Sequence, residues 1–258
     1  MTMMRILSKT NRSVLQQFAW SSVLLAFDYD GTLAPIVTDP KQAFMRPSTH
    51  ALLEQVTQRY PCAVISGRAQ ADARERLQGV KVVSIVGNHG LEPWEGSERF
   101  VKEVRGWLPA LQQLAKTLPG VRVEDKNFSV AVHYRRSRAK KKARRAILKA
   151  AVGLGPVRII GGKAVVNILP FDAPHKGMAL ERERARLHCD TAIYVGDDET
   201  DEDVFTLDQP GRLLTIRVGS SAKSLATYCL LNQGEIDELL KVLLELRAGG
   251  EHQQRAGG

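Results

Sequence analysis

The stretch Val23-Leu24-Leu25-Ala26-Phe27-Asp28-Tyr29-Asp30-Gly31-Thr32-Leu33 decides the fold, because five consecutive apolar residues run into two acids and a glycine. A short apolar run of this kind is typical of a buried parallel strand. Residues two apart in an extended chain point the same way, so the carboxylates of Asp28 and Asp30 can approach one centre. Two neighbouring carboxylates repel each other unless a cation lies between them. The pattern therefore favours a metal-assisted nucleophile beside a proton donor over an ordinary Asp-Gly turn.

Three more short apolar runs have the same character and are also interpreted as buried strands: residues 62–65, 82–86 and 192–195. A helical segment at residues 49–59 precedes the first of them. Strands that alternate with helices predict an α/β protein whose core is a Rossmann-like, doubly wound parallel sheet. In such sheets ligands bind beyond the carboxyl ends of the strands. The polar motifs described below all fall at such ends.

The pattern changes between about residues 97 and 170. Two helical segments and four strand-like segments follow one another there: a helix at 98–118, strands at 121–124 and 128–134, a helix from about 137, and strands at 157–160 and 164–169. This order predicts an inserted α+β cap domain at residues 98–170. The core is then formed by residues 1–97 and 171–247, and residues 248–258 are expected to be a disordered tail.

A strongly acidic segment, residues 196–203, follows the predicted strand at 192–195, with six acids in eight residues. Acids at the start of a helix also offset its dipole, so the composition alone does not require a ligand. Asp197 and Asp201, however, are four apart and share one face of a helix. Carboxylate oxygens are the ligands that hard cations prefer, magnesium above all. Together with Asp28 and Asp30, these acids predict a magnesium site.

Two further motifs offer groups that can bind a phosphate. Ser66-Gly67-Arg68 follows the strand at 62–65 and provides a hydroxyl and backbone amides for phosphate oxygens. Considered on its own, this segment slightly favours an ordinary Ser-Gly turn. Lys176 precedes a helical stretch, where a single lysine is commonly just solvated. Because the two acidic motifs are also present, a lysine that stabilises phosphoryl charge is a better interpretation of Lys176 than a solvated lysine.

The order Asp28-x-Asp30, Ser66, Lys176 and Gly196-Asp197 with Asp201 resembles the four signature motifs of the haloacid dehalogenase superfamily of phosphatases. The resemblance implies that Asp28 attacks phosphorus and that Asp30 protonates the leaving oxygen and then activates water. It also implies that Ser66 and Lys176 hold the phosphoryl group. Magnesium is expected on Asp28, the backbone carbonyl of Asp30 and Asp197, with Asp201 in support. Such a division of labour suits phosphoryl transfer, which depends on positioning and charge neutralisation.

The part of the chain between the Ser66 and Lys176 motifs is similar to the trehalose-6-phosphate phosphatase family in four short segments: residues 87–92, 124–126, 133–135 and 162–163. This resemblance implies hydrolysis of trehalose 6-phosphate to trehalose and phosphate, a step of trehalose biosynthesis. It further implies sugar-binding residues in addition to Gly67 and Arg68, namely His89, Glu124, Lys126, Arg135, Lys163 and Asn167. Asn167 departs from the family pattern, which has a glutamate there, so another disaccharide or glycosyl phosphate is the alternative substrate.

The net charge of +9 raises the alternative of nucleic-acid binding. Nine Lys or Arg residues and no acid occupy residues 135–149, so the excess charge is confined to one predicted helix. That helix lacks the interleaved aromatics of a stacking platform, and a solvated cap face is the preferred interpretation. A non-catalytic sugar-phosphate sensor on the same core is another alternative. Such a sensor has no need for Asp30 together with Ser66 and Lys176.

Three scattered cysteines without a CxxC pair argue against a disulfide framework and fit a cytoplasmic protein. No stretch is apolar enough for a membrane span, since the run at residues 14–27 is interrupted by glutamines and serines. The expected partner is therefore a phosphorylated disaccharide, with neither nucleic acid nor membrane involved. The sequence leaves the oligomeric state open.

Overall fold

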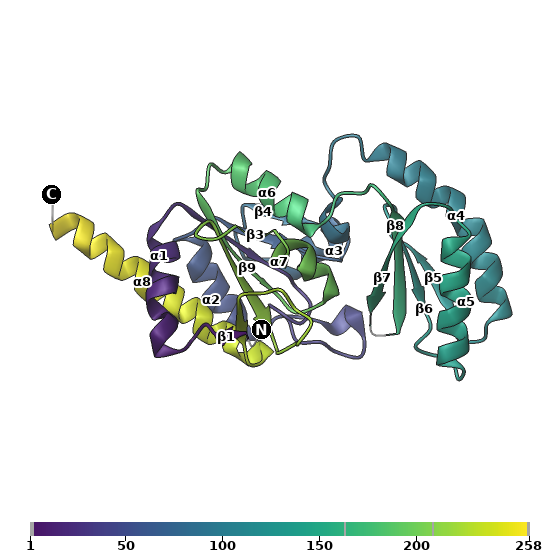
Figure 1. Cartoon of the computed structure of the whole chain (residues 1–258), viewed down its shortest axis with the longest axis horizontal. Helices are drawn as coiled ribbons and strands as arrows, with labels where there is room; N and C mark the ends of the chain where they lie inside the picture. The colour runs from purple at the N-terminus through teal and green to yellow at the C-terminus, as the bar shows by residue number, and fades with distance from the viewer. Residues whose placement is uncertain (1–2, 163, 208, 257–258) are drawn as a thin grey trace. The chain divides into compact units, whose positions relative to one another are not determined.

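The structure is a computed structural model that describes residues 3–162, 164–207 and 209–256 (Figure 1). The chain divides into two compact units. The core unit is formed by Met1–Gly90 and His175–Gly258, and the cap unit by Leu91–Pro174. The cap unit thus begins and ends a few residues outside the insertion expected at 98–170.

The core unit is built on a seven-stranded sheet in which all neighbouring strands are parallel, in the order β1-β11-β10-β9-β2-β3-β4. Its strands are β1 (Met4–Arg5), β2 (Val23–Phe27), β3 (Cys62–Ile65), β4 (Ser84–Val86), β9 (Thr191–Gly196), β10 (Leu213–Val218) and β11 (Tyr228–Leu230). The strand expected at 82–86 is shorter than predicted and begins at Ser84. The predicted doubly wound parallel sheet is confirmed.

Helices cover both faces of this sheet (Figure 1). They are α1 (Arg12–Trp20), α2 (Pro47–Thr57), α3 (Gln70–Arg76), α6 (Lys176–Arg186), α7 (Glu202–Phe205) and α8 (Ile236–Ala256). Short 3-10 turns complete the unit: η1 (Lys9–Asn11), η2 (Pro40–Gln42), η3 (Asn88–Gly90), η4 (Glu199–Asp201) and η5 (Gln233–Glu235). Alternate residues of β2 point to opposite faces: Leu25 packs with α1, α2 and α8, and Leu24 with α6 and α7.

The cap unit is an antiparallel four-stranded sheet, ordered β5-β6-β8-β7, with two helices. Its elements are α4 (Glu98–Thr117), β5 (Arg122–Asp125), β6 (Val130–His133), α5 (Lys140–Val152), β7 (Val157–Gly162) and β8 (Val165–Pro170). Both helices pack on one face of the sheet, where Trp107 of α4 and Ile147 of α5 share a buried cluster with Val132 and Val166. The expected α+β cap is confirmed.

The end of the chain differs from the expected disordered tail at 248–258. Helix α8 continues through Ala256, so residues 248–256 are helical. Gly249 and Gly250 each disfavour a helix by about 1 kcal/mol relative to alanine. The flanking arginine, alanine, glutamate and glutamine residues are good helix formers and no proline interrupts them. Within the described ranges, none of the helices combines the length and apolar character needed to cross a bilayer.

The cap cluster around Ile147 leads to a stability prediction. Ile147 is fully buried, so Ile147→Ala removes packed methyl groups and leaves a cavity. We expect the free energy of unfolding of the cap to fall by about 2–5 kcal/mol. Urea unfolding followed by tryptophan fluorescence measures this loss. The control Lys149→Ala, at an exposed position of the same helix, should change it by less than about 0.5 kcal/mol. Equal stability of the two variants would contradict this packing.

Candidate active site

The candidate site is built from loops at the carboxyl ends of adjacent core strands. Strand β2 lies between β9 and β3, so the residues that follow these three strands meet at one edge of the sheet. Asp28 follows β2, Ser66 follows β3 and Asp197 follows β9. The Asp28 N–H donates to the carbonyl of Val195 at 2.9 Å, which ties the end of β2 to β9.

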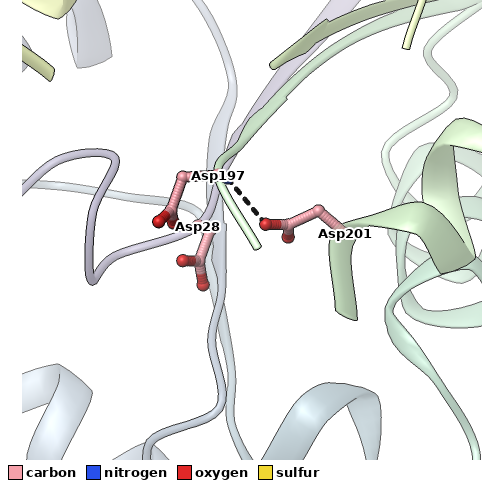
Figure 2. Close-up of side chains that lie close together, drawn as sticks. All are labelled: Asp28, Asp197 and Asp201. Carbon is pink, nitrogen blue, oxygen red and sulfur yellow. Dashed lines mark hydrogen bonds between the residues drawn. The ribbon is translucent and has the colours of Figure 1, made fainter. Parts of the chain in front are cut away.

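Three carboxylates gather at this edge (Figure 2). One oxygen from each of Asp28, Asp197 and Asp201 lies within 4.8 Å of the others. Asp28 and Asp201 are buried and Asp197 is half-buried. The structure therefore brings together three of the four residues expected to surround a metal, with side chains from two loops far apart in the sequence.

Lys176 supplies the balancing positive charge. This lysine, the first residue of α6, is 1% exposed, and its Nζ donates to Oδ1 of Asp28 at 2.9 Å and to Oδ1 of Asp201 at 2.7 Å. Burial acts to lower the pKa of Lys176, but the charges of Asp201 and Asp28 outweigh it and raise that pKa well above its ordinary value. Lys176 is therefore a fixed ammonium between two carboxylates.

Asp201 is saturated with hydrogen bonds. Its Oδ1 accepts from Lys176 and from the hydroxyl of Tyr194 at 2.7 Å. Its Oδ2 accepts from the backbone N–H groups of Asp197 at 2.8 Å and Asp198 at 2.9 Å. A carboxylate has about four lone-pair sites. Asp201 therefore fixes the backbone of the loop that carries Asp197.

Asp197 is in the opposite situation. Its Oδ1 is buried and has no hydrogen-bond partner among the described residues. A Cβ on Gly31 would lie 2.1–2.5 Å from the Asp197 carboxyl atoms, so only glycine fits beneath that carboxylate. Gly31 also has a φ of +87°, a backbone conformation that favours glycine. The backbone at Gly31 thus leaves room for the Asp197 carboxylate, whose Oδ1 has no hydrogen-bond partner among the described residues.

The electrostatics of the cluster favour a bound cation. Burial is the largest influence on Asp28 and raises its pKa well above the ordinary value, while Lys176 acts to lower it. Burial, followed by the charges of Asp201 and Asp198, raises the pKa of Asp197 to about 7. Three carboxylates around one ammonium leave an excess of buried negative charge. The donor set and the orphaned oxygen of Asp197 therefore fit a hard divalent cation.

The carboxylate of Asp30 is held away from this cluster. Arg68 binds it through both oxygens, with Nε to Oδ2 and Nη2 to Oδ1 both at 2.6 Å. The Nη1 of Arg68 donates to Asp72 at 2.6 Å, and the guanidinium lies 5.5 Å from the ring centroid of Tyr29. Arg68, expected to bind substrate, is thus engaged by two acids. The expected metal contact of Asp30 uses its backbone carbonyl, which this pairing does not block.

The Ser66-Gly67-Arg68 loop is braced by the segment after β4. The backbone N–H of His89 donates to the carbonyl of Ser66 at 2.9 Å, and that of Asn88 to the carbonyl of Arg68 at 2.7 Å. A Cβ on Gly67 would lie 2.4 Å from the His89 ring. Asn88 and His89 have φ values of 48° and 60°, which cost energy in residues other than glycine. His89 therefore supports the loop that carries the buried Ser66.

In the cap, two residues expected to bind sugar lie in one row across the sheet. Glu124 of β5 pairs with Ala131 of β6, which pairs with Asn167 of β8. The neighbouring row, Val123, Val132 and Val166, faces the helices, so Glu124 and Asn167 lie on the opposite face.

Glu124 also accepts a hydrogen bond from His133. The Nε2 of His133 lies 2.6 Å from the Glu124 carboxylate, and this hydrogen bond is the largest cause of the lowered pKa of Glu124. Lys126 follows β5 and Arg135 follows β6, whereas Lys163 lies outside the described residues.

Two residues of the site were not foreseen from the sequence. The hydroxyl of Tyr194 donates to Asp201. Because Tyr194 lies within β9, the sequence alone predicts only another buried strand residue at this position. Arg217 of β10 donates to the backbone carbonyls of Asp197 and Asp198. A lone arginine in the strand Leu-Leu-Thr-Ile-Arg-Val was a usable signal, because a charge at the carboxyl end of a buried strand needs a partner.

Comparison with known proteins places these features in a family. The family model described as trehalose-phosphatase matches residues 26–228. The probable trehalose-phosphate phosphatase 4 of Oryza sativa subsp. japonica is 32% identical over 243 residues, covering 86% of this chain and 66% of that protein. The trehalose-phosphate phosphatase of Mycobacterium avium (strain 104) is 37% identical over 196 residues, covering 69% and 49%. This chain thus spans about two thirds of the length of the Oryza sativa protein and about half of the length of the Mycobacterium avium protein.

A solved structure shows the same fold. The C-terminal domain of the C. albicans trehalose-6-phosphate phosphatase matches with a TM-score of 0.78 at 23% identity, covering 95% of this chain and 99% of that one.

The raised pKa of Asp197 leads to a prediction for the metal-free protein. The folded carboxyl, with a pKa of about 7, holds its proton more tightly than an unfolded aspartate of about 3.9. This contribution to stability is fully present below about pH 4 and is lost as the pH rises to about 7. In EDTA, the free energy of unfolding of Asp197→Asn minus that of the parent should therefore increase by roughly 3 kcal/mol from pH 4 to 7.

Urea titrations at several pH values measure this difference. Asp190→Asn, at an exposed position before β9, is the matched control and should give a flat difference. A flat difference for Asp197→Asn as well would contradict the unusual environment of Asp197.

Proposed function

We propose that this chain, which belongs to the trehalose-phosphatase family, hydrolyses trehalose 6-phosphate to trehalose and inorganic phosphate. The observation that carries the proposal is the buried ammonium of Lys176 between Asp28 and Asp201. It lies at the edge of the core sheet where Asp28, the Ser66-Gly67-Arg68 loop and the acidic segment at residues 196–203 meet. A nucleophile must be ionised, and the ammonium of Lys176 favours that form of Asp28 against the burial that raises its pKa. A cation bound at the cluster would favour it further.

In the first step, a carboxylate oxygen of Asp28 attacks phosphorus, and the bond from phosphorus to the sugar oxygen breaks. Lys176 and the loop of Ser66 stabilise the charge on the phosphoryl oxygens. Asp30 gives its proton to the leaving sugar oxygen, which departs as the hydroxyl of trehalose. The product on the enzyme is an aspartyl-phosphate at Asp28.

In the second step, Asp30 takes a proton from water while the water oxygen attacks the aspartyl-phosphate. The phosphorus–oxygen bond to Asp28 breaks, so the carboxylate is regenerated and inorganic phosphate leaves. In this structure the bidentate pair with Arg68 occupies both carboxylate oxygens of Asp30. For the first step, Arg68 has to release at least one oxygen of Asp30.

The cofactor that fits the acidic cluster is magnesium, which Asp28, the backbone carbonyl of Asp30 and Asp197 would hold, with Asp201 in support. When bound, it would neutralise charge on the phosphate and favour attack by an anionic nucleophile. The support for it is the orphaned oxygen of Asp197 and the excess of buried carboxylates.

The sugar is proposed to bind the face of the cap sheet that carries Glu124 and Asn167. Sugar hydroxyls would form hydrogen bonds with the cap residues expected to bind them, namely Glu124, Lys126, Arg135, Lys163 and Asn167. A ligand that leaves such polar groups unpaired binds with lower affinity. Asn167, which is neutral, favours one alternative within the same chemistry: another disaccharide or glycosyl phosphate. The proposed partner is thus a phosphorylated sugar rather than nucleic acid or membrane. The buried free cysteines Cys62, Cys189 and Cys229 fit a reducing compartment such as the cytoplasm.

The nucleophile provides the direct test of the reaction. We expect Asp28→Asn to lower phosphate release from trehalose 6-phosphate with magnesium by at least about 10³-fold, because no other group can form the covalent intermediate. Asp30→Asn should slow or trap the phosphoenzyme. A malachite-green assay measures release, and Asp190→Asn, at an exposed acid, should behave like the parent. Turnover by Asp28→Asn at the parent rate would rule out the mechanism.

The cap provides the test of the substrate. Glu124→Gln keeps the size of the side chain but removes the charge that binds a hydroxyl and His133. We expect KM for trehalose 6-phosphate to rise about 10- to 100-fold, as for the loss of one charged hydrogen bond. Turnover of p-nitrophenyl phosphate, which has no sugar, should not change. Glu98→Gln, at an exposed cap position, is the matched control.

The parent protein should also be offered sucrose 6-phosphate, glucose 6-phosphate and a mannosyl phosphate. A preference for another disaccharide phosphate would support the alternative. Equal release from all four substrates would reduce the proposal to a general sugar phosphatase.

A further inference from the structure

We propose that Arg217 is a positioning residue that fixes the acidic loop, defined as residues 197–201, in the conformation that binds the divalent cation. This inference rests on the proposed function, because it concerns the cation of that same site. Arg217 is outside every motif that the sequence offered. Its support is a set of contacts within the core unit.

Strand β10 places Arg217 directly beside the start of the acidic loop. Arg217 is paired in register with Gly196, the last residue of β9. Its Nη2 donates to the carbonyl of Asp197, and its Nη1 donates to the carbonyl of Asp198 at 3.2 Å. Only 14% of the Arg217 side chain is exposed. One planar guanidinium thus binds two consecutive carbonyls, a geometry that a lysine ammonium cannot reproduce.

The acidic loop is therefore held from both sides. The backbone N–H groups of Asp197 and Asp198 donate to Oδ2 of Asp201, while their carbonyls accept from Arg217. With both backbone polar groups of Asp197 bound, the peptide planes on either side of its Cα cannot rotate freely. The direction in which its carboxylate leaves the backbone is then set before a cation arrives.

A second acid fixes the guanidinium itself. Oε1 of Glu202 accepts from Nη1 of Arg217 at 3.0 Å, and Oε2 accepts from the backbone N–H of Leu225 at 2.9 Å. Glu202 is the first residue of α7, so β10, the acidic loop and α7 are joined through one side chain. Outer partners of this kind, which orient a ligand without touching the metal, typically change metal affinity 10- to 100-fold when removed.

The direction of the change in cation affinity distinguishes a positioning role of Arg217 from a purely electrostatic one. The positive charge of Arg217 repels a cation near Asp197, so removing that charge alone would strengthen cation binding. Removing the two hydrogen bonds would release the acidic loop and weaken binding. Positioning therefore predicts weaker binding in a neutral variant, the opposite of what the charge predicts.

The experiment measures magnesium binding to the full-length protein without substrate, by competition with Tb³⁺ luminescence. We expect Arg217→Met to weaken Mg²⁺ binding by about 10- to 100-fold. Arg217→Lys, which keeps the charge but not the two-carbonyl geometry, should also bind more weakly than the parent. Arg12→Met, which removes an exposed ion pair with Glu245 on distant helices, is the control and should bind within about twofold of the parent.

Kinetics give a second readout. The magnesium concentration that half-saturates phosphate release should rise in Arg217→Met, while KM for trehalose 6-phosphate at saturating magnesium stays unchanged. A general structural defect would instead change both and would lower the melting temperature in EDTA.

Equal or tighter Mg²⁺ binding by folded Arg217→Met would overturn the inference. If that variant does not fold, parent-like binding by Arg217→Lys would overturn it as well. A parent protein that binds Mg²⁺ but releases no phosphate from any sugar phosphate would defeat the proposed function. Weaker Mg²⁺ binding by the Arg217 variants would still support positioning in that case.

Discussion

The ammonium of Lys176, buried between Asp28 and Asp201, is the interaction on which the rest of the site depends. Removing charges from water costs several kcal/mol per ion, and the cost is recovered only when each charge is paired and its remaining hydrogen-bonding sites are filled. Asp201 meets this condition fully, with four donors around its carboxylate. Asp28 and Asp197 do not, which leaves negative charge at the edge where the proposed reaction requires a phosphate and a cation to bind together.

Much of this site follows from the local sequence. The pattern Asp28-x-Asp30-Gly31 after an apolar run places two acids at the end of a strand, because side-chain alternation in a strand is a local property. The alternation of strands and helices in the same way predicts the parallel sheet. The neighbours Asp197 and Asp201 could be foreseen because both lie in one short acidic segment.

What the sequence could not predict depends on which strands become neighbours. Arg217 reaches the acidic loop only because β10 lies beside β9, and Arg68 reaches Asp30 only because β3 lies beside β2. The paired left-handed conformations of Asn88 and His89 likewise follow from a tertiary requirement, bracing the loop after β3, although neither residue is a glycine. At the chain end, where the sequence predicts a disordered tail from residue 248, helix α8 continues to Ala256.

The residues proposed for chemistry and those proposed for sugar recognition lie in different units. All the groups proposed to act on the phosphate lie in the core unit, on loops fixed by the parallel sheet. The row of Glu124 and Asn167 belongs to the cap, whose opposite face is held by an apolar cluster with α4 and α5. A polar substitution in that row changes the hydrogen bonds offered to a sugar without disturbing either the cap core or the carboxylate cluster. Under the proposed function, Asn167 in place of the family's glutamate would therefore alter which sugar binds while leaving phosphoryl transfer intact.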